Sequence, residues 1–92
     1  MEIEHKDDGK KGAFLIKVDG DAAGEMTYVW AGPNSFIIDH TGVGDALRGK
    51  GAGKQLVEKA VEFARKKGVS IMPLCPFAKK VIESNPEFRD VL

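Results

Sequence analysis

Alternating hydrophobic and polar positions in the first half of the chain predict an antiparallel sheet. Residues 13 to 18 and 26 to 31 are rich in β-branched and aromatic side chains, and the turn signal Asp-Gly-Asp lies between them. A second turn at 31 to 34 precedes another apolar run, and Ile3 marks a short polar edge strand. The pattern therefore predicts four antiparallel strands.

The second half of the chain changes to a helical period. From residue 53 apolar residues recur at three- and four-residue spacing, and basic residues precede Gly68, as at the C-terminus of a helix. Residues 69 to 74 then fit a short buried strand. The order strand, helix, strand predicts a parallel crossover between the fourth and fifth strands.

The last part of the chain predicts a short second helix. Pro76 suits the first helical position, which makes Cys75 the expected N-cap. The apolar stripe of this helix is expected at Phe77, Val81 and Ile82. The tail is expected to dock through Phe88, Val91 and Leu92. Since the chain has only 92 residues, we expect one α+β domain spanning residues 1 to 92.

Composition narrows the function classes. Lysine plus arginine and aspartate plus glutamate both number 14, so no net positive field would attract a nucleic acid. No apolar stretch is long enough to span a membrane, and the charged first dozen residues do not resemble a secretory signal. A single cysteine excludes an internal disulfide, which favours a reducing, cytoplasmic location. Two histidines and one cysteine show no metal-ligand spacing.

The fourth strand ends in a polar segment with candidate chemistry. Strict alternation predicts that His40 continues the apolar face of Phe36 and Ile38, while Asp39 and Thr41 point the opposite way. Glycines at 42 and 44 then weaken the strand, as where a ligand approaches the backbone closely. His5, in the polar N-terminal stretch, is expected to be exposed, and Tyr28 and Trp30 are expected to share a strand face.

A run of alternating glycines, L-R-G-K-G-A-G-K, precedes the long helix. It fails as a P-loop, because Gly51 stands where that motif needs a hydroxyl. It also fails as the dinucleotide fingerprint, because its glycines at 49, 51 and 53 are spaced by twos. The remaining pattern is Arg-x-x-Gly-x-Gly, beginning at Arg48.

Glycines at a helix N-terminus let backbone amides converge on an anion, and the helix adds unpaired N–H groups there. Lys50 and Lys54 could pair with further phosphate oxygens, and Arg48 could do so or brace the loop. The alternative is a flexible, solvated turn. Because glycine is unfavourable in the first turn of a helix, the pattern favours a pyrophosphate cradle.

The glycine motif at 48 to 53 resembles the signature of the GNAT acetyltransferase superfamily. The segments H-T-G-V at 40 to 43 and P-L-C-P-F from residue 73, with the ending N-P-E-F-x-D-V-L, look like the minimal single-domain members. The resemblance implies a three-layer α+β fold whose mostly antiparallel, twisted sheet is splayed between parallel strands four and five. It also implies acetyl-CoA as co-substrate, with pantetheine along strand four at Gly42 and Val43. The pyrophosphate would then be bound by the amides of Gly49, Lys50, Gly51, Ala52, Gly53 and Lys54.

The resemblance further implies acetyl transfer to a primary amine. Most family members protonate the departing thiolate with a tyrosine after strand five, but the single tyrosine here is Tyr28, in the third strand. Cys75 stands where the loop after strand five enters the next helix, and it could carry the acetyl group or act as general acid, with His40 as base. The alternatives are an inert buried Cys75 and a structural His40.

Two other functions remain open at this point. The missing tyrosine is compatible with a module that binds acyl-CoA and has little or no activity, and a structural glycine loop is compatible with an interaction domain. The identity of the amine acceptor, whether a small molecule or a protein, and the oligomeric state cannot be derived from the sequence.

Overall fold

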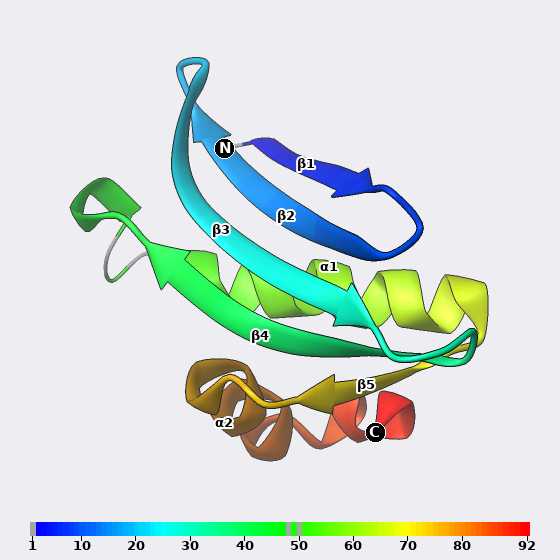
Figure 1. The fold of residues 1–92 in the computed structure, drawn as a ribbon. Helices are drawn as coiled ribbons and strands as arrows, with labels where there is room; N and C mark the ends of the chain where they lie inside the picture. Colours follow the sequence, from blue (N-terminus) through cyan, green and yellow to red (C-terminus); the bar gives the residue numbers. More distant parts are fainter. Residues whose placement is uncertain (1, 48, 50) are drawn as a thin grey trace.

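The computed structural model describes residues 2–47, 49 and 51–92, which form one mixed sheet with helices packed against it (Figure 1). The strands are β1 (Glu2–Asp7), β2 (Lys11–Val18), β3 (Asp21–Trp30), β4 (Ser35–Val43) and β5 (Ser70–Pro73). The helices are α1 (Ala52–Lys67) and α2 (Pro76–Ser84), and the 3-10 helices are η1 (Asp45–Leu47) and η2 (Pro86–Val91).

The strands lie in the sheet in the same order as in the sequence. β1 to β4 pair antiparallel, and β5 pairs parallel with β4, which confirms the predicted crossover. Asp19 and Gly20 both have positive φ angles, 53° and 85°. Positive φ at both central residues is the geometry of a type I′ hairpin turn, so the predicted β2–β3 hairpin is confirmed as well.

Both α-helices lie on one face of the sheet. α1 packs on β2, β3, β4 and β5, while α2 and η2 contact α1 from the β5 side. In Figure 1 the sheet is seen in front of α1. The α+β class and the mixed sheet are confirmed, but the expected third layer is not found among the described residues. The physical reason is that β1 leads to β2 through a tight turn, which leaves no helix to cover the second face.

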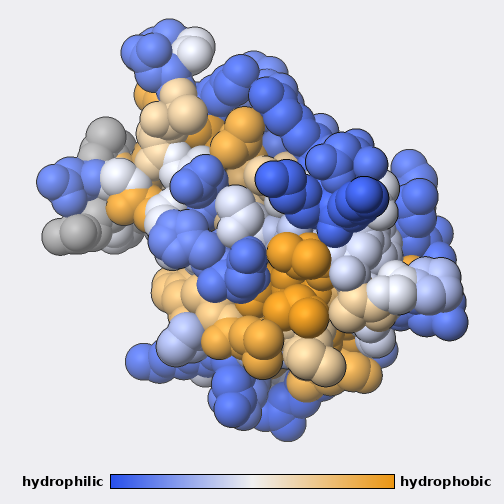
Figure 2. Space-filling model, in the orientation of Figure 1, coloured by the Kyte–Doolittle hydropathy of each residue, from blue (hydrophilic) through white to orange (hydrophobic). Residues whose placement is uncertain are grey.

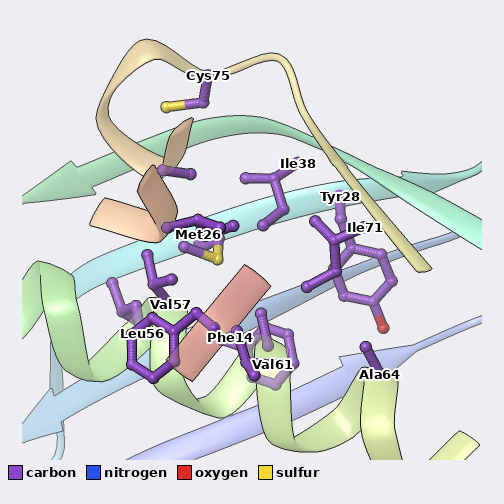
Figure 3. Close-up of a cluster of buried hydrophobic side chains, with 14 of the residues drawn as sticks. Phe14, Met26, Tyr28, Ile38, Leu56, Val57, Val61, Ala64, Ile71 and Cys75 are labelled. Carbon is purple, nitrogen blue, oxygen red and sulfur yellow. The ribbon is translucent and has the colours of Figure 1, made fainter. Parts of the chain in front are cut away.

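The core lies between the sheet and α1. Figure 3 shows strand side chains such as Met26 and Ile38 directed at Leu56, Val57 and Val61 of the helix. All five are at most 1% exposed. Burying an aliphatic side chain of this size stabilises a fold by about 1.5–3 kcal/mol. This contact therefore accounts for much of what holds α1 on the sheet.

The opposite face of the sheet is open to solvent. Figure 2 shows hydrophobic atoms gathered over the middle of this face, with hydrophilic residues around them. Two large hydrophobic residues that are exposed in the strands of the sheet are Val29 of β3 (41% exposed) and Met72 of β5 (49% exposed). Neither α1 nor α2, in the described part of the chain, is long and apolar enough to cross a membrane.

The helix ends follow the predicted signals. Gly68 has a φ of 70°, and its amide donates to the carbonyls of Ala64 and Arg65, which closes the C-terminus of α1. Beyond α2, Phe88 and Val91 are buried as expected. The expectation for Leu92 is wrong, because this side chain is 55% exposed at the end of the chain.

Candidate functional site

A fork between β4 and β5 is the central feature of the site. The two strands pair only from Ser35 to Ile38, and the amides of Leu74 and Cys75 both donate to the Ile38 carbonyl, at 3.1 and 3.0 Å. Beyond the Asp39 bulge, β4 continues to Val43, and among the strands of the described residues only β3 pairs with this part. Backbone groups on this free edge of β4 can therefore pair with an extended ligand, as an added strand would.

A β-bulge at the fork changes which side chains of β4 face the core. Thr27 pairs with His40 and Tyr28 pairs with Ile38, so Asp39 is the extra residue. A bulge shifts the alternation by one position. Thr41 therefore lies opposite the buried Met26, whereas His40 is exposed on the other face. The predicted faces of His40 and Thr41 are wrong, because strict alternation cannot account for an inserted residue.

Cys75 lies at the fork as the N-cap of α2, in agreement with the sequence. Its side chain is buried, and its thiol contacts the Thr41 hydroxyl, with 3.6 Å between Sγ and Oγ1. Burial alone would raise the pKa of the thiol, but the amides of Ala78 and Phe77 and the Thr41 hydroxyl outweigh it. The pKa of Cys75 is therefore lowered, and a larger fraction of the side chain is in the thiolate form than in an ordinary buried cysteine.

The glycine loop lies at the open end of the fork. Gly49 and Gly51 have positive φ angles, 81° and 72°, and Gly51 is the N-cap of α1. The first-turn amides of a helix have no partner within the helix, so those of Ala52 to Lys54 are available to a ligand. The predicted ligands Arg48 and Lys50 lie outside the residues that the structure describes.

A cavity of about 400 Å³ adjoins this loop. Its lining comes from the end of β4, the loop, the start of α1 and α2, and consists of Val43, Leu47, Gly49, Gly51, Ala52, Gly53, Lys54, Phe77 and Val81. The structure thus brings together most of the described residues that were predicted to bind the cofactor. Gly42 lies on the neighbouring part of β4, beside His40, whose Nε2 would be 3.2 Å from a Cβ at that position.

Phe77 is a site residue that the sequence pattern assigned wrongly. It was expected in the buried stripe of α2, but Ala78 and Ile82 fill that role, and Phe77 is 43% exposed. Its ring covers Gly53 so closely that a Cβ there would lie 2.3 Å from Cζ. The packing of α2 against the start of α1 is therefore a second reason for glycine in this turn.

The single tyrosine lies in the central strand β3, and its hydroxyl points away from the fork toward the edge strand β1. The Tyr28 hydroxyl donates to Oδ2 of Asp7 at 2.5 Å and lies 2.7 Å from Nε2 of His5. Trp30 Nε1 also donates to Asp7. Burial and the Asp7 hydrogen bond raise the pKa of Tyr28 far above its ordinary value. This hydroxyl is therefore unsuited to protonate a thiolate at the fork.

His5 is more constrained than the sequence indicated. Although part of it is exposed, its ring stacks on Phe14 at a centroid distance of 4.2 Å, and Phe63 of α1 packs edge-on against it at 4.5 Å. Within the described residues, no group of three or more His, Cys, Asp or Glu side chains lies close enough together to hold a metal ion.

A mixed sheet forked between parallel strands, with a glycine loop and helix N-terminus at the open end of the fork, is the arrangement expected of an acetyl-CoA-dependent acyltransferase. A model of the GCN5-related N-acetyl-transferase family matches residues 13–91, so this chain belongs to that family. The predicted family resemblance and enzyme class are thereby confirmed.

Relatives and solved structures agree with this assignment. Protein NATD1 of Xenopus tropicalis is 30% identical over 88 residues, which cover 94% of this chain and 78% of NATD1. A GCN5-like protein of Staphylococcus aureus, solved by NMR, is 39% identical, has a TM-score of 0.73 and is matched over 96% of this chain and 85% of its own. An acetyl-CoA-bound GNAT acetyltransferase of Elizabethkingia anophelis shares the fold at 17% identity, with a TM-score of 0.62 over 70% of this chain and 42% of its own.

Proposed function

We propose that this chain binds acetyl-CoA in the fork between β4 and β5 and transfers the acetyl group to a primary amine. The observation that carries the proposal is the continuity of the free β4 edge, from Asp39 to Val43, with the glycine loop before α1. An extended pantetheine arm would pair with this edge, and the pyrophosphate would lie on the helix N-terminus. A neighbour of the same fold has acetyl-CoA bound, which supports acetyl-CoA as the ligand.

The binding groups follow from this arrangement. The amides of residues 49 to 54 would hold the pyrophosphate, and Gly42 and Val43 would pair with pantetheine. Lys54 is exposed beside these amides and would add a positive charge. Arg48 and Lys50 are proposed as ligands on the family pattern alone, since they lie outside the described part of the chain.

The thioester would reach Cys75 at the closed end of the fork. The span from Val43 to Asp39 is about 13 Å for an extended strand. Cys75 then acts in one of two ways: its thiolate accepts the acetyl group and passes it to the amine, or its thiol protonates the departing CoA while the amine attacks directly. A lowered pKa serves both routes.

His40 is proposed as the base for the incoming amine. Because it lies on the face away from Thr41, and Thr41 is the neighbour of Cys75, it would act on the amine and not on the cysteine. A neutral imidazole can accept the proton that the amine loses as it attacks the thioester.

Binding is tested by calorimetric titration of the protein with CoA. Arg48→Glu combined with Gly51→Asp should abolish binding, because both changes put negative charge where the pyrophosphate would lie. Lys66→Glu, an exposed position at the other end of α1, is the matched control and should bind like the wild type. Unchanged affinity in the double variant, with its far-ultraviolet circular dichroism intact, would refute the proposed site.

The route is tested by intact mass spectrometry after incubation with acetyl-CoA. A hydroxylamine-labile acetyl adduct that disappears in Cys75→Ala would support the acyl-cysteine route, provided that denatured protein shows no comparable adduct. A noncovalent complex and turnover without an adduct would support direct transfer.

A second candidate function is an acyl-CoA-binding module without significant turnover. It is favoured by the position of Tyr28, which is bound to Asp7 and not at the fork. Tight CoA binding with no CoA release across a broad panel of primary amines would favour this function over catalysis.

A further inference from the structure

A groove crosses the open face of the sheet next to the fork. It has a volume of about 410 Å³ and is lined by side chains of all four antiparallel strands. Its lining includes Lys6, Lys11, Ala13, Thr27, Val29 and Asp39. They lie on the face away from α1, which the described helices leave uncovered.

One end of the groove carries a carboxylate. Asp39 is the bulge residue of β4, and its Oδ1 accepts a hydrogen bond from the Thr27 hydroxyl at 2.6 Å. This bond fixes the carboxylate, which still has lone pairs to accept a hydrogen bond from an ammonium group. Because β5 leaves β4 directly after Ile38, Asp39 is also the first residue beyond the fork.

The other end of the groove carries lysines. Lys6 pairs in register with Ala13, Ala13 with Thr27, and Thr27 with His40, so the groove runs across the strands. β1 is three strand spacings from β4, so the backbone of Lys6 lies about 14 Å from the backbone of β4. The long lysine side chain reduces the distance between its ammonium group and Asp39. Lys11 precedes Ala13 on the same face of β2, since residues two apart share a face.

The two aspartates at the lysine end are already engaged. Asp7 accepts hydrogen bonds from Tyr28 and Trp30, and Asp8 accepts from the amides of Lys10 and Lys11. Lys6 makes a loose contact with Glu4, 3.6 Å between Nζ and Oε1. Lys11 also interacts electrostatically with the Asp8 carboxylate, to which its own amide donates, so Lys6 is the less engaged cation at this end. Small or apolar side chains, Ala13 and Val29, line the middle.

We infer that this groove binds the acetyl acceptor, and that the acceptor is a small zwitterion: a primary amine joined by a short aliphatic segment to an anionic group. The inference rests on the proposed function, because Asp39 lies beside the place where the thioester would end. At the fork the core face of β4 carries the contact between Thr41 and Cys75, so the amine approaches from the open face. Asp39 binds the ammonium, and Lys6 and Lys11 bind the anionic group.

The test uses 6-aminohexanoate as probe and hexylamine as its matched neutral-tail control. Each is titrated into the ¹⁵N-labelled full chain, with and without saturating CoA, and amide shifts are followed by NMR. The expected result is saturable shifts at Ala13, Thr27 and Val29 with 6-aminohexanoate, and binding at least about fivefold weaker with hexylamine, because two exposed charge contacts of about 0.5 kcal/mol each are lost.

Two variants test which end of the groove binds the ammonium group of the probe and which end binds its anionic group. Asp39→Asn keeps an oxygen for the Thr27 hydroxyl but loses the charge, so it should weaken both probes. Lys6→Gln combined with Lys11→Gln should weaken 6-aminohexanoate about fivefold and leave hexylamine unchanged. Lys66→Glu, on α1, is the control and should change neither.

Three results would overturn the inference: equal binding of the two probes, shifts confined to other parts of the molecule, or no shifts at all. Shifts in the groove with a lysine-containing peptide but not with 6-aminohexanoate would replace the small zwitterion by a protein acceptor and would also overturn it. A different result would refute the proposed function: addition of CoA alone would produce no amide shifts in β4 and α1. Probe binding in the groove without CoA would still support the ligand class.

Discussion

Gly49, Gly51 and Gly53 alternate along the loop and the first turn of α1, but glycine is required at these positions for different physical reasons. Gly49 and Gly51 have positive φ angles, which side chains with a Cβ rarely adopt. Gly53 has ordinary helical geometry and instead lies under the Phe77 ring. A cofactor explains why amides converge here, but only the first two glycines are required by the backbone conformation of the loop.

This distinction gives a prediction for α1. Gly53→Ala alone should bring little or no gain in stability, because the new methyl group meets the Phe77 ring. In a Phe77→Ala background the same change should raise the free energy of unfolding by about 0.5–1 kcal/mol through helix propensity. Gly51→Ala should lower it by about 1–2 kcal/mol in either background. Urea denaturation of the six proteins measures all three effects, and strict additivity of Gly53→Ala and Phe77→Ala would contradict the contact.

The contact between Cys75 and Thr41 gives a second prediction at this scale. The Thr41 hydroxyl helps to lower the pKa of the thiol, so Thr41→Val should raise that pKa. Alkylation of Cys75 by iodoacetamide at neutral pH should therefore become slower, and its pH profile should move upward. His40→Gln is the matched control, because His40 faces the other side of β4. An equal shift in His40→Gln would show that the imidazole, and not the hydroxyl, sets the thiol pKa.

At the scale of elements, β4 combines two kinds of pairing in one strand. Its first half lies between β3 and β5, and its second half is paired to β3 alone. The Asp39 bulge marks the change, since an extra residue bends the strand away from its neighbour. The fork is thus built into β4 and does not depend on a separate loop.

A ligand in the fork should leave a clear signature in hydrogen exchange. Amides of residues 39 to 43 that face the free edge should exchange quickly in the unliganded protein and slow by at least about tenfold with saturating CoA. Residues 36 to 38, already paired on both sides, should change much less. Equal protection of both halves of β4 would indicate general stabilisation and not a ligand on this edge.

The elements themselves were largely predictable, because each depends on signals within a short segment. The β2–β3 hairpin follows from its turn residues, and α1 follows from its apolar period and its terminal glycine. The site was predicted less completely. The bulge at Asp39 depends on how two strands pair, so its effect on His40 and Thr41 could not be derived from either strand alone. The contact of Phe77 with Gly53 likewise arises only when two helices meet.

For the whole molecule, the side chains of His5, Asp7 and Tyr28 tie the edge strand β1 to the centre of the sheet. Tyr28 reaches Asp7 by crossing over Gly12, where a Cβ would lie 2.4 Å from the ring. The tie combines neutral His5 with charged Asp7, and the pKa of each is lowered. For His5 burial is the main cause; for Asp7 burial is opposed and outweighed by hydrogen bonds from Tyr28, Gly9 and Trp30.

The stability of the fold should therefore fall on acidification in two steps. Below the ordinary histidine pKa of 6.5, the unfolded chain takes up a proton that folded His5 resists, so the free energy of unfolding falls until the pH passes the lowered pKa of His5. A second fall begins near the ordinary aspartate pKa of 3.8, where the unfolded chain takes up a proton that folded Asp7 resists, and it ends as the pH passes the lowered pKa of Asp7.

Urea denaturation between pH 7.5 and pH 4.5 measures the first step. His5→Gln, which cannot titrate, should flatten the dependence in this range, and Asp7→Asn should leave much of the first step in place. An unchanged slope in His5→Gln, or greater stability of the wild type at the acidic end, would contradict this assignment.

The order of the strands has a consequence for how the molecule folds. Every antiparallel pair joins neighbours along the chain, so these hairpins close short loops and can form early. β5 pairs with β4 across the whole of α1 in the sequence, so this pairing closes the longest loop in the sheet and we expect it to form more slowly than the hairpins. We therefore expect the fork to lie at a contact that forms late in folding, so a molecule bound across it should lengthen the lifetime of the folded state more than it speeds folding.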